Sequence, residues 1–157
     1  MSARSPRVVH LAKRLVGMMS RRQIADDDLR WVSSVLLDGE SELWHALPVA
    51  DQRHSLLVAE RFNEALNRAD SEVSRDDIAA ALLHDIGKTA SDLGIIERVV
   101  ATLVGPRTRR FHLYHAHEQI GAEMLAAAGS SVRTISLIDG TSLDRWVVEA
   151  LRRADDI

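Results

Sequence analysis

The stretch Ile78-Ala-Ala-Ala-Leu-Leu-His-Asp-Ile-Gly-Lys88 is the most informative part of this chain. Its six leading apolar residues, which follow the capping residue Ser74, are typical of a short helix that is buried on nearly all sides. The run ends in His84 and Asp85. A carboxylate at the end of a buried helix is costly unless it is paired, hydrogen-bonded or bound to a cation. The stretch therefore predicts a polar site at the edge of a helical core.

Apolar residues recur at helical spacing on both sides of this stretch. Residues 131–138 fit either a helix or a strand, and we find no repeat and no linker. We therefore predict an all-α protein, a single bundle of about seven or eight helices. The other predicted helices cover residues 6–19, residue 26 to Gly39, residues 41–47 before Pro48, and residues 51–67, 91–105, 111–128 and 143–155.

Composition agrees with one compact domain. The chain has 157 residues, of which 46% are hydrophobic and 27% charged, and its formal net charge is −3. We expect a single domain over residues 1–157, in which an N-terminal helical extension, residues 1–48, packs on a core of residues 50–157. The nearly balanced charge argues against a nucleic-acid binder. The absence of cysteine excludes disulfides and thiolate ligands, so that any metal must use nitrogen and oxygen ligands.

Residues 1–22 carry six basic residues and no acidic one. Lys13 and Arg14 interrupt their apolar positions, which is unlike a signal peptide. No stretch approaches the roughly 20 apolar residues of a membrane span. We expect an amphipathic packing helix with a solvated basic face, the alternative being a helix that faces a membrane or a phosphate. A cytoplasmic protein is expected, and apolar surface on the N-terminal helices would allow a homodimer.

Polar residues interrupt the apolar faces of three separate helices. His54 continues the apolar stripe of its helix, and Asp155 lies on the apolar side of the last helix, whereas Asp156 falls on the polar side. Together with His84 and Asp85 they offer two imidazoles and two carboxylates to one interior. Such a set suits one divalent ion, Mn, Fe, Co, Ni, Zn or Mg. Taken singly, each residue also fits an ordinary structural role.

The ordered motifs Arg53-His54-Ser55, Leu82-Leu83-His84-Asp85-Ile86-Gly87-Lys88 and Arg153-Ala154-Asp155 resemble the HD superfamily of metal-dependent phosphohydrolases. The His-Asp-Ile-Gly-Lys string is the most specific of them. The resemblance spans about residues 50–157, and the chain looks like a small stand-alone HD protein of the actinobacterial type. The segment His117-Glu-Gln-Ile-Gly121 looks like the His-Pro-x-x-Gly helix of the HD-GYP branch, with Glu118 in place of the proline.

The resemblance implies that His54, His84, Asp85 and Asp155 are the metal ligands. The expected catalytic residues are Asp85, Lys88 and Arg53, of which Lys88 and Arg53 are candidates for binding the phosphate through their positive charge. Alternatively, Lys88 is a solvated lysine in a loop, and Arg53 is a surface arginine at the start of its helix. Gly87 can adopt the left-handed conformation that ends a helix, which would turn Lys88 back towards the site.

One departure from the family bears on mechanism. Branches of the family with two or three metals carry additional histidines in the region that corresponds to residues 135–141, and this chain has none there. We therefore expect a mononuclear centre, with His117 in the cleft or at a second site. The expected activity is hydrolysis of a phosphomonoester or phosphodiester of a nucleotide or similar small metabolite, by a metal-activated water. Asp51, His117 and Asp85 are the general-acid candidates. The alternatives are a metal-binding regulatory or sensor module and a domain whose histidines only pack.

Overall fold

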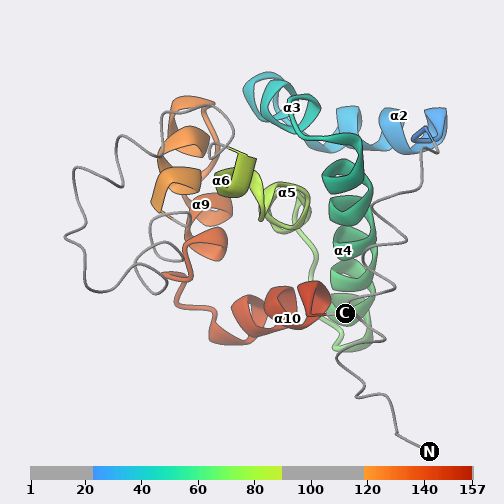
Figure 1. Ribbon diagram of the computed structural model, residues 1–157. Helices are drawn as coiled ribbons and strands as arrows, with labels where there is room; N and C mark the ends of the chain where they lie inside the picture. Colours follow the sequence, from blue (N-terminus) through green and yellow to red (C-terminus); the bar gives the residue numbers. More distant parts are fainter. Residues whose placement is uncertain (1–22, 90–118, 157) are drawn as a thin grey trace, which may run out of the picture.

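The computed structural model describes residues 23–89 and 119–156, and all regular structure in these two ranges is helical (Figure 1). The expectation of an all-α bundle is confirmed. Residues 119–127 are helical as well. The named helices are α2 (Asp26–Val35), α3 (Asp38–His45), α4 (Val49–Arg68), α5 (Arg75–Leu83), α6 (Ile86–Thr89), α9 (Val132–Ile138) and α10 (Arg145–Asp155).

Short polar side chains fix where the helices begin. Ser74 precedes α5, and its Oγ accepts a hydrogen bond from the backbone N–H of Asp77, while the Asp77 carboxylate accepts from the Ser74 N–H at 2.9 Å. This reciprocal pair satisfies two N–H groups that the helix cannot pair itself. Ser131 caps α9 through Thr134 N–H, and Asp144 caps α10 in the same way. These caps place α5 and α10, the helices that lead into the candidate site.

Two predicted boundaries need correction, and one assignment that was left open is settled. Gly39 does not end the second helix, because α2 stops at Val35 and Gly39 is the second residue of α3. The ambiguous residues 131–138 form a helix, since Ser131 provides an N-cap. The last helix begins at Arg145 and not at residue 143, because Asp144 is its cap. The predicted helices over residues 6–19 and 91–105, and the first part of 111–128, lie outside the described residues.

Helix α5 forms the centre of the core. All of its residues from Asp77 to Leu83 are buried, and Figure 1 shows it nearly end-on between α4 and α9, with α10 crossing beside α4. Phe62 and Leu66 of α4 are fully buried against this core. Burying an aliphatic or aromatic side chain of this size contributes about 1.5–3 kcal/mol. The packing therefore holds the C-terminal end of α5, where His84 follows, at a fixed place.

Two glycines allow backbones to touch. A side chain at Gly39 would collide with the backbone carbonyl of Ala128, so that α3 and the segment after residue 127 approach closely only because this position lacks one. A Cβ atom at Gly121 would lie 3.4 Å from the backbone nitrogen of Gly87. The helix of residues 119–127 thus packs on α6, directly after the His84-Asp85 pair.

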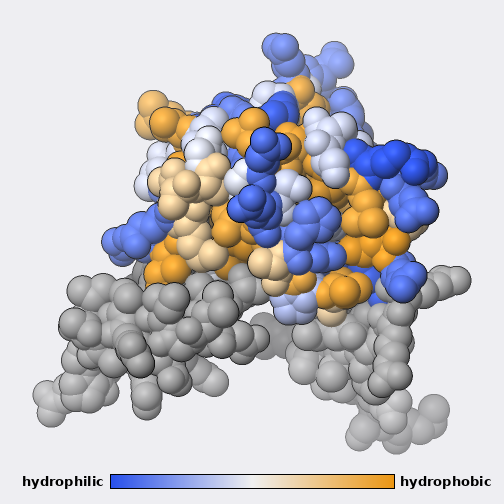
Figure 2. Space-filling model, turned by 90° about the horizontal axis from the view of Figure 1, so that it is seen from above, coloured by the Kyte–Doolittle hydropathy of each residue, from blue (hydrophilic) through white to orange (hydrophobic). Residues whose placement is uncertain are grey.

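The outer surface mixes hydrophilic and hydrophobic residues on the face that Figure 2 views. Single large apolar side chains such as Leu37, Val49 and Leu57 are exposed. Among the described helices, none combines the length and the hydrophobicity that crossing a membrane would require.

Candidate metal centre

Three helices bring two imidazoles and two carboxylates together. His54 comes from the second turn of α4, His84 and Asp85 from the junction of α5 and α6, and Asp155 from the last residue of α10. Nε2 of His54 lies 2.8 Å from Oδ1 of Asp155. The rings of His54 and His84 have centroids 5.6 Å apart. Residues up to 101 positions apart in the sequence thus share one small polar site.

His84 has a fixed orientation. Its Nδ1 lies 2.8 Å from the carbonyl oxygen of Ala81, one turn earlier in α5. A carbonyl oxygen only accepts, so Nδ1 must carry the proton. The Nε2 atom is buried and makes no hydrogen bond of good geometry with the described residues, although Oδ1 of Asp155 lies 3.3 Å away and Oδ1 of Asp85 3.5 Å away. A buried nitrogen with an available lone pair is thus aimed at two carboxylates.

The electrostatics of this nitrogen favour a positive charge beside it. Burial lowers the pKa of His84, but the nearby carboxylates of Asp155 and Asp85 and the Ala81 carbonyl outweigh burial and raise this pKa above its ordinary 6.5. A second proton would have to sit on Nε2, between the two carboxylates. A proton and a cation therefore compete for the same position.

The donor atoms next to Asp155 are spaced almost as the ligands of one divalent cation would be. Ligands bound at about 2.1 Å are about 3.0–3.4 Å apart at octahedral or tetrahedral angles. The described contacts of Asp155 Oδ1, at 2.8 Å to His54 and 3.3 Å to His84, are close to this range. One ligand atom each from His54, His84 and Asp85 lie within 4.8 Å of one another. Nitrogen and carboxylate donors suit a transition metal or, with more oxygen, magnesium.

The structure places Asp155, and not Asp156, at this site. Val148, Leu151 and Ala154 form the buried side of α10, and Asp155 follows Leu151 by one turn on that side. Asp156 is exposed. The side chain of Asp155 retains 30% of its accessible surface, whereas that of His84 retains 9%. The site is therefore open to solvent on the Asp155 side.

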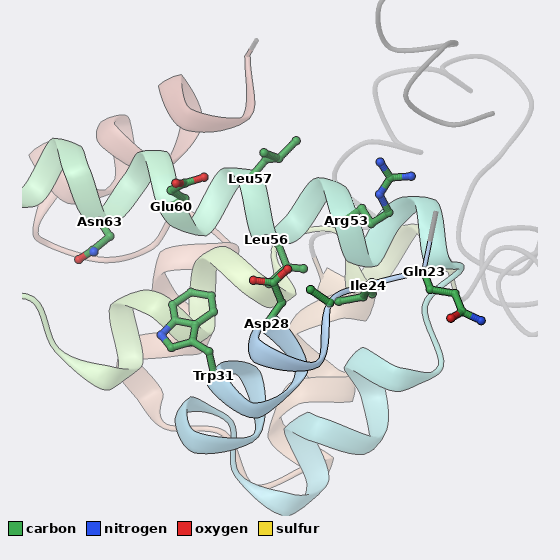
Figure 3. Close-up of a pocket in the computed structure, with 10 residues that line it drawn as sticks. Gln23, Ile24, Asp28, Trp31, Arg53, Leu56, Leu57, Glu60 and Asn63 are labelled. Atoms are coloured by element: carbon green, nitrogen blue, oxygen red, sulfur yellow. The ribbon is translucent and has the colours of Figure 1, made fainter. Parts of the chain in front are cut away.

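Arg53 lies in a different setting from its neighbour His54. It lines a groove of about 640 Å³ between the N-terminal end of the described chain and α4, together with Ile24, Trp31 and Leu56 (Figure 3). Consecutive residues of a helix point about 100° apart, so His54 faces the core while Arg53 faces the groove. A role for Arg53 at a phosphate stays a prediction.

The remaining predicted residues are placed only in part. Lys88 belongs to α6, which starts right after Asp85, and its side chain is not among those described. His117 lies outside the described residues. The expectation that Gly87 ends a helix in the left-handed conformation is wrong, because Gly87 lies within α6 and the described glycines with positive φ are Gly129 and Gly140. The close packing of Gly121 gives Gly87 a different structural reason.

Buried polar residues around the site were missed in the sequence. Gln52 and Ser55 flank His54 on α4 and are buried, and Glu40 of α3 is completely inaccessible. A signal for Gln52 and Ser55 exists in retrospect, because both lie on the core side of a helix whose other core positions are apolar. Glu40 carries no such signal, since its partner Arg75 is 35 residues away.

Fold and site together define an all-helical domain with a mixed histidine and carboxylate cluster in its core. The HD domain family matches residues 52–153, which is more than half of the chain. The protein therefore belongs to this family, which is part of a superfamily of metal-dependent phosphohydrolases. His54, His84 and Asp85 lie within the matched residues, and Asp155 follows them. No match was found among curated proteins, and none among solved structures.

Proposed function

We propose that the protein hydrolyses a phosphomonoester or phosphodiester of a small metabolite, with a nucleotide as the favoured class, and that His54, His84, Asp85 and Asp155 hold one divalent cation. Membership of the HD family supports the general reaction. The observation that carries the ligand assignment is the buried Nε2 atom of His84, whose other ring nitrogen is tied to Ala81 and whose nearest charged groups are two carboxylates.

A bound divalent cation would lower the pKa of a water molecule and polarise a phosphoryl oxygen. The residues of the chain then have separate tasks. The two imidazoles and the two carboxylates fix the position of the reacting centre, and the tautomer of His84 is set by Ala81 in advance. Lys88, which follows Asp85 by three residues, is proposed to compensate negative charge on the phosphate. Arg53 is the second residue proposed for this task.

Asp51 is one of three candidates for protonating the leaving group. It lies in the first turn of α4, one turn before His54, and is half-buried. A carboxylic acid that is partly shielded from water can give its proton to a departing oxygen. Asp85, which is itself a proposed ligand, and His117 are the alternatives.

Metal analysis followed by a substrate panel tests the proposal. The purified protein is stripped with a chelator, reconstituted separately with Mn²⁺, Co²⁺ or Ni²⁺, and assayed against phosphomonoesters, phosphodiesters and nucleotides. We expect metal-dependent turnover that is lost in His84→Asn, whereas His45→Asn, an exposed histidine on α3, keeps it. Failure to bind any metal would refute the ligand assignment.

A regulatory or sensor module is the second candidate. The observation that favours it is the lack of histidine in residues 135–141, where α9 ends. Within residues 23–89 and 119–156, moreover, one group of three metal-ligating side chains was found, that of His54, His84 and Asp85. Metal binding without turnover across the whole panel would favour this function. A homodimer also stays a prediction, which sedimentation of the metal-loaded protein can check.

A further inference from the structure

Helix α3 contacts both of the helices that lead to the candidate metal centre, although it precedes the region that matches the HD family. One end of α3 is joined to α4, which carries His54. The other end is joined to α5, which leads into His84 and Asp85. In Figure 1, α3 lies across the end of the bundle at which α4 begins.

The joint between α3 and α4 is a set of buried hydrogen bonds around Gln52. The side-chain Nε2 of Gln52 lies 3.2 Å from the carbonyl oxygens of both Trp44 and His45, and 3.0 Å from that of Leu47. The carbonyls of Trp44 and His45 belong to the last turn of α3, and that of Leu47 to the turn that follows it. The Trp44 carbonyl also accepts from the Leu47 N–H at 3.1 Å. The indole N–H of Trp44 also donates to Ser55 Oγ at 2.9 Å. His54 lies between Gln52 and Ser55, so this joint holds the turn of α4 that carries it.

The joint between α3 and α5 is a buried ion pair. Nη1 of Arg75, the first residue of α5, donates to Oε2 of Glu40 at 2.6 Å, and Nη2 donates to Oε1 at 3.3 Å. The Glu40 side chain is completely inaccessible to solvent. Oε2 also accepts from the Leu37 N–H at 2.9 Å. A buried carboxylate that loses its partner is strongly destabilising, so the pair ties α5 firmly to α3.

We propose that α3 acts as a brace that sets the position of α4 relative to α5, and thereby the position of His54 relative to His84 and Asp85. Gln52, Trp44, Glu40 and Arg75 are then positioning residues for the metal centre. This inference rests on the proposed function. Metal sites tolerate ligand shifts of about 0.2 Å, so a small displacement of one helix weakens binding even when the fold is intact.

The alternative is that these residues only stabilise the fold. A matched control separates the two, because α5 makes a second ion pair of the same kind. Arg133 of α9 donates to the buried carboxylate of Asp77 at 2.8 Å. Arg133→Gln therefore removes the cation from a buried carboxylate in α5, as Arg75→Gln does in α3, and α9 carries none of the proposed ligands. The other ion pair of Arg133, with Asp144 before α10, is a distant one at 3.9 Å.

The experiment compares Gln52→Leu, Arg75→Gln and Arg133→Gln with the unchanged full chain, using Co²⁺ as the probe. Urea unfolding of the metal-free proteins identifies conditions in which each is folded. We expect Gln52→Leu and Arg75→Gln to weaken Co²⁺ binding about 10–100-fold, the range found when groups that orient ligands are removed. Their visible Co²⁺ spectra at saturation should also change. Arg133→Gln should lose stability but keep both the affinity and the spectrum.

Trp44→Phe, which removes the hydrogen bond to Ser55 and keeps an aromatic ring in the core, replaces any variant that does not fold. Two results would refute the positioning role of α3. One is an unchanged Co²⁺ affinity in Gln52→Leu, Arg75→Gln and Trp44→Phe, and the other is an equal loss of affinity in Arg133→Gln. If the unchanged protein binds no Co²⁺, the proposed function fails instead. The ring resonances of His54 and His84 in the metal-free protein then decide the inference, since only brace variants should shift them.

Discussion

Nδ1 of His84 lies 2.8 Å from the carbonyl oxygen of Ala81, within the helix that forms the centre of the core. This bond uses a carbonyl from the last turn of α5, which a helix leaves without a backbone partner. The same bond fixes the ring plane and presents Nε2 to Asp85 and Asp155. One hydrogen bond at the end of α5 therefore both provides a partner for the Ala81 carbonyl and fixes the orientation of His84, the proposed ligand.

Replacing Asp155 should weaken metal binding, whereas replacing its neighbour should not. Asp155→Asn removes a charged donor from the site, so we expect the affinity for Mn²⁺ to fall by at least about tenfold. Asp156→Asn is the control, because Asp156 is exposed. Isothermal titration calorimetry measures both. An equal loss in the two variants would mean that Asp155 acts through general charge and not as a ligand.

The same residue should link metal binding to stability. A cation at about 100 times its dissociation constant stabilises a folded protein by about 2.7 kcal/mol. We expect the unchanged chain to show such a rise in melting temperature with added Mn²⁺, and a chain that lacks residues 155–157 to show none. Both should keep most of their helical circular dichroism, since the core of α4 and α5 does not involve these residues.

The metal content should be one ion per chain. We expect His117→Ala to retain that ion, because the four proposed ligands do not include His117. Elemental analysis of the dialysed proteins gives the stoichiometry. Two ions in the unchanged protein and one in the variant would instead assign His117 to a second site.

Lys88→Ala should lower the turnover number more than it lowers metal affinity. A lysine is a mobile point charge suited to a phosphate and unsuited to binding a cation. The loss should appear in kcat if the contact strengthens in the transition state. Lys88→Arg should restore part of the rate, and Arg68→Ala, on an exposed part of α4, serves as the control. Identical kinetics for Lys88→Ala and the unchanged protein would remove Lys88 from the site.

Asp76 should make stability depend on pH in the acid range. Burial raises the pKa of Asp76, but hydrogen bonds from Ser131 and Arg75 and the charges of Arg75 and Arg133 outweigh this and lower the pKa below its ordinary 3.8. A lowered pKa in the folded state adds stability above the ordinary value, and this stability is lost as the pH falls through the folded-state pKa.

We therefore expect Asp76→Asn to be less stable than the unchanged chain at pH 7, with the difference shrinking as the pH falls below 3.8. Urea unfolding of the chelator-treated proteins between pH 3 and pH 7 measures this. Glu72→Gln, an exposed carboxylate before α5, should show no comparable trend. A difference that persists unchanged at pH 3 would assign the effect of Asp76 to hydrogen bonding alone.

Apolar spacing predicted the helical class well, because each amphipathic face has to be buried somewhere. Helix ends were harder. Gly39 looked like a helix stop, since glycine often ends helices, but here it allows α3 to approach the carbonyl of Ala128. Residues 131–138 stayed ambiguous because the apolar residues of so short a segment fit both a helix and a strand, and the cap of Ser131 decided for a helix. Where a helix ends thus depends in part on contacts between residues that are far apart in the sequence.

The site was predictable where polar residues interrupt an apolar stripe. His54 and Asp155 were assigned to the interior on that basis, and the structure places them 2.8 Å apart. The supporting residues were not predictable. Glu40 lies in a segment rich in acidic residues and looks solvated, and only the position of Arg75 at the start of α5 makes its burial possible. Gly87 was misassigned for the same reason, because the close approach of Gly121 is not visible in the local sequence.

The separation of 101 residues between His54 and Asp155 has a consequence for the newly made chain. Ribosomes add about 5–20 residues per second, so about 5–20 s pass between the synthesis of His54 and that of Asp155. From the synthesis of Asp85 onwards, α4 and α5 are already made and carry His54, His84 and Asp85 without their fourth partner. A metal ion met at that stage would find an incomplete set of ligands, and full affinity would arise only after α10 has been synthesised and has packed against α4.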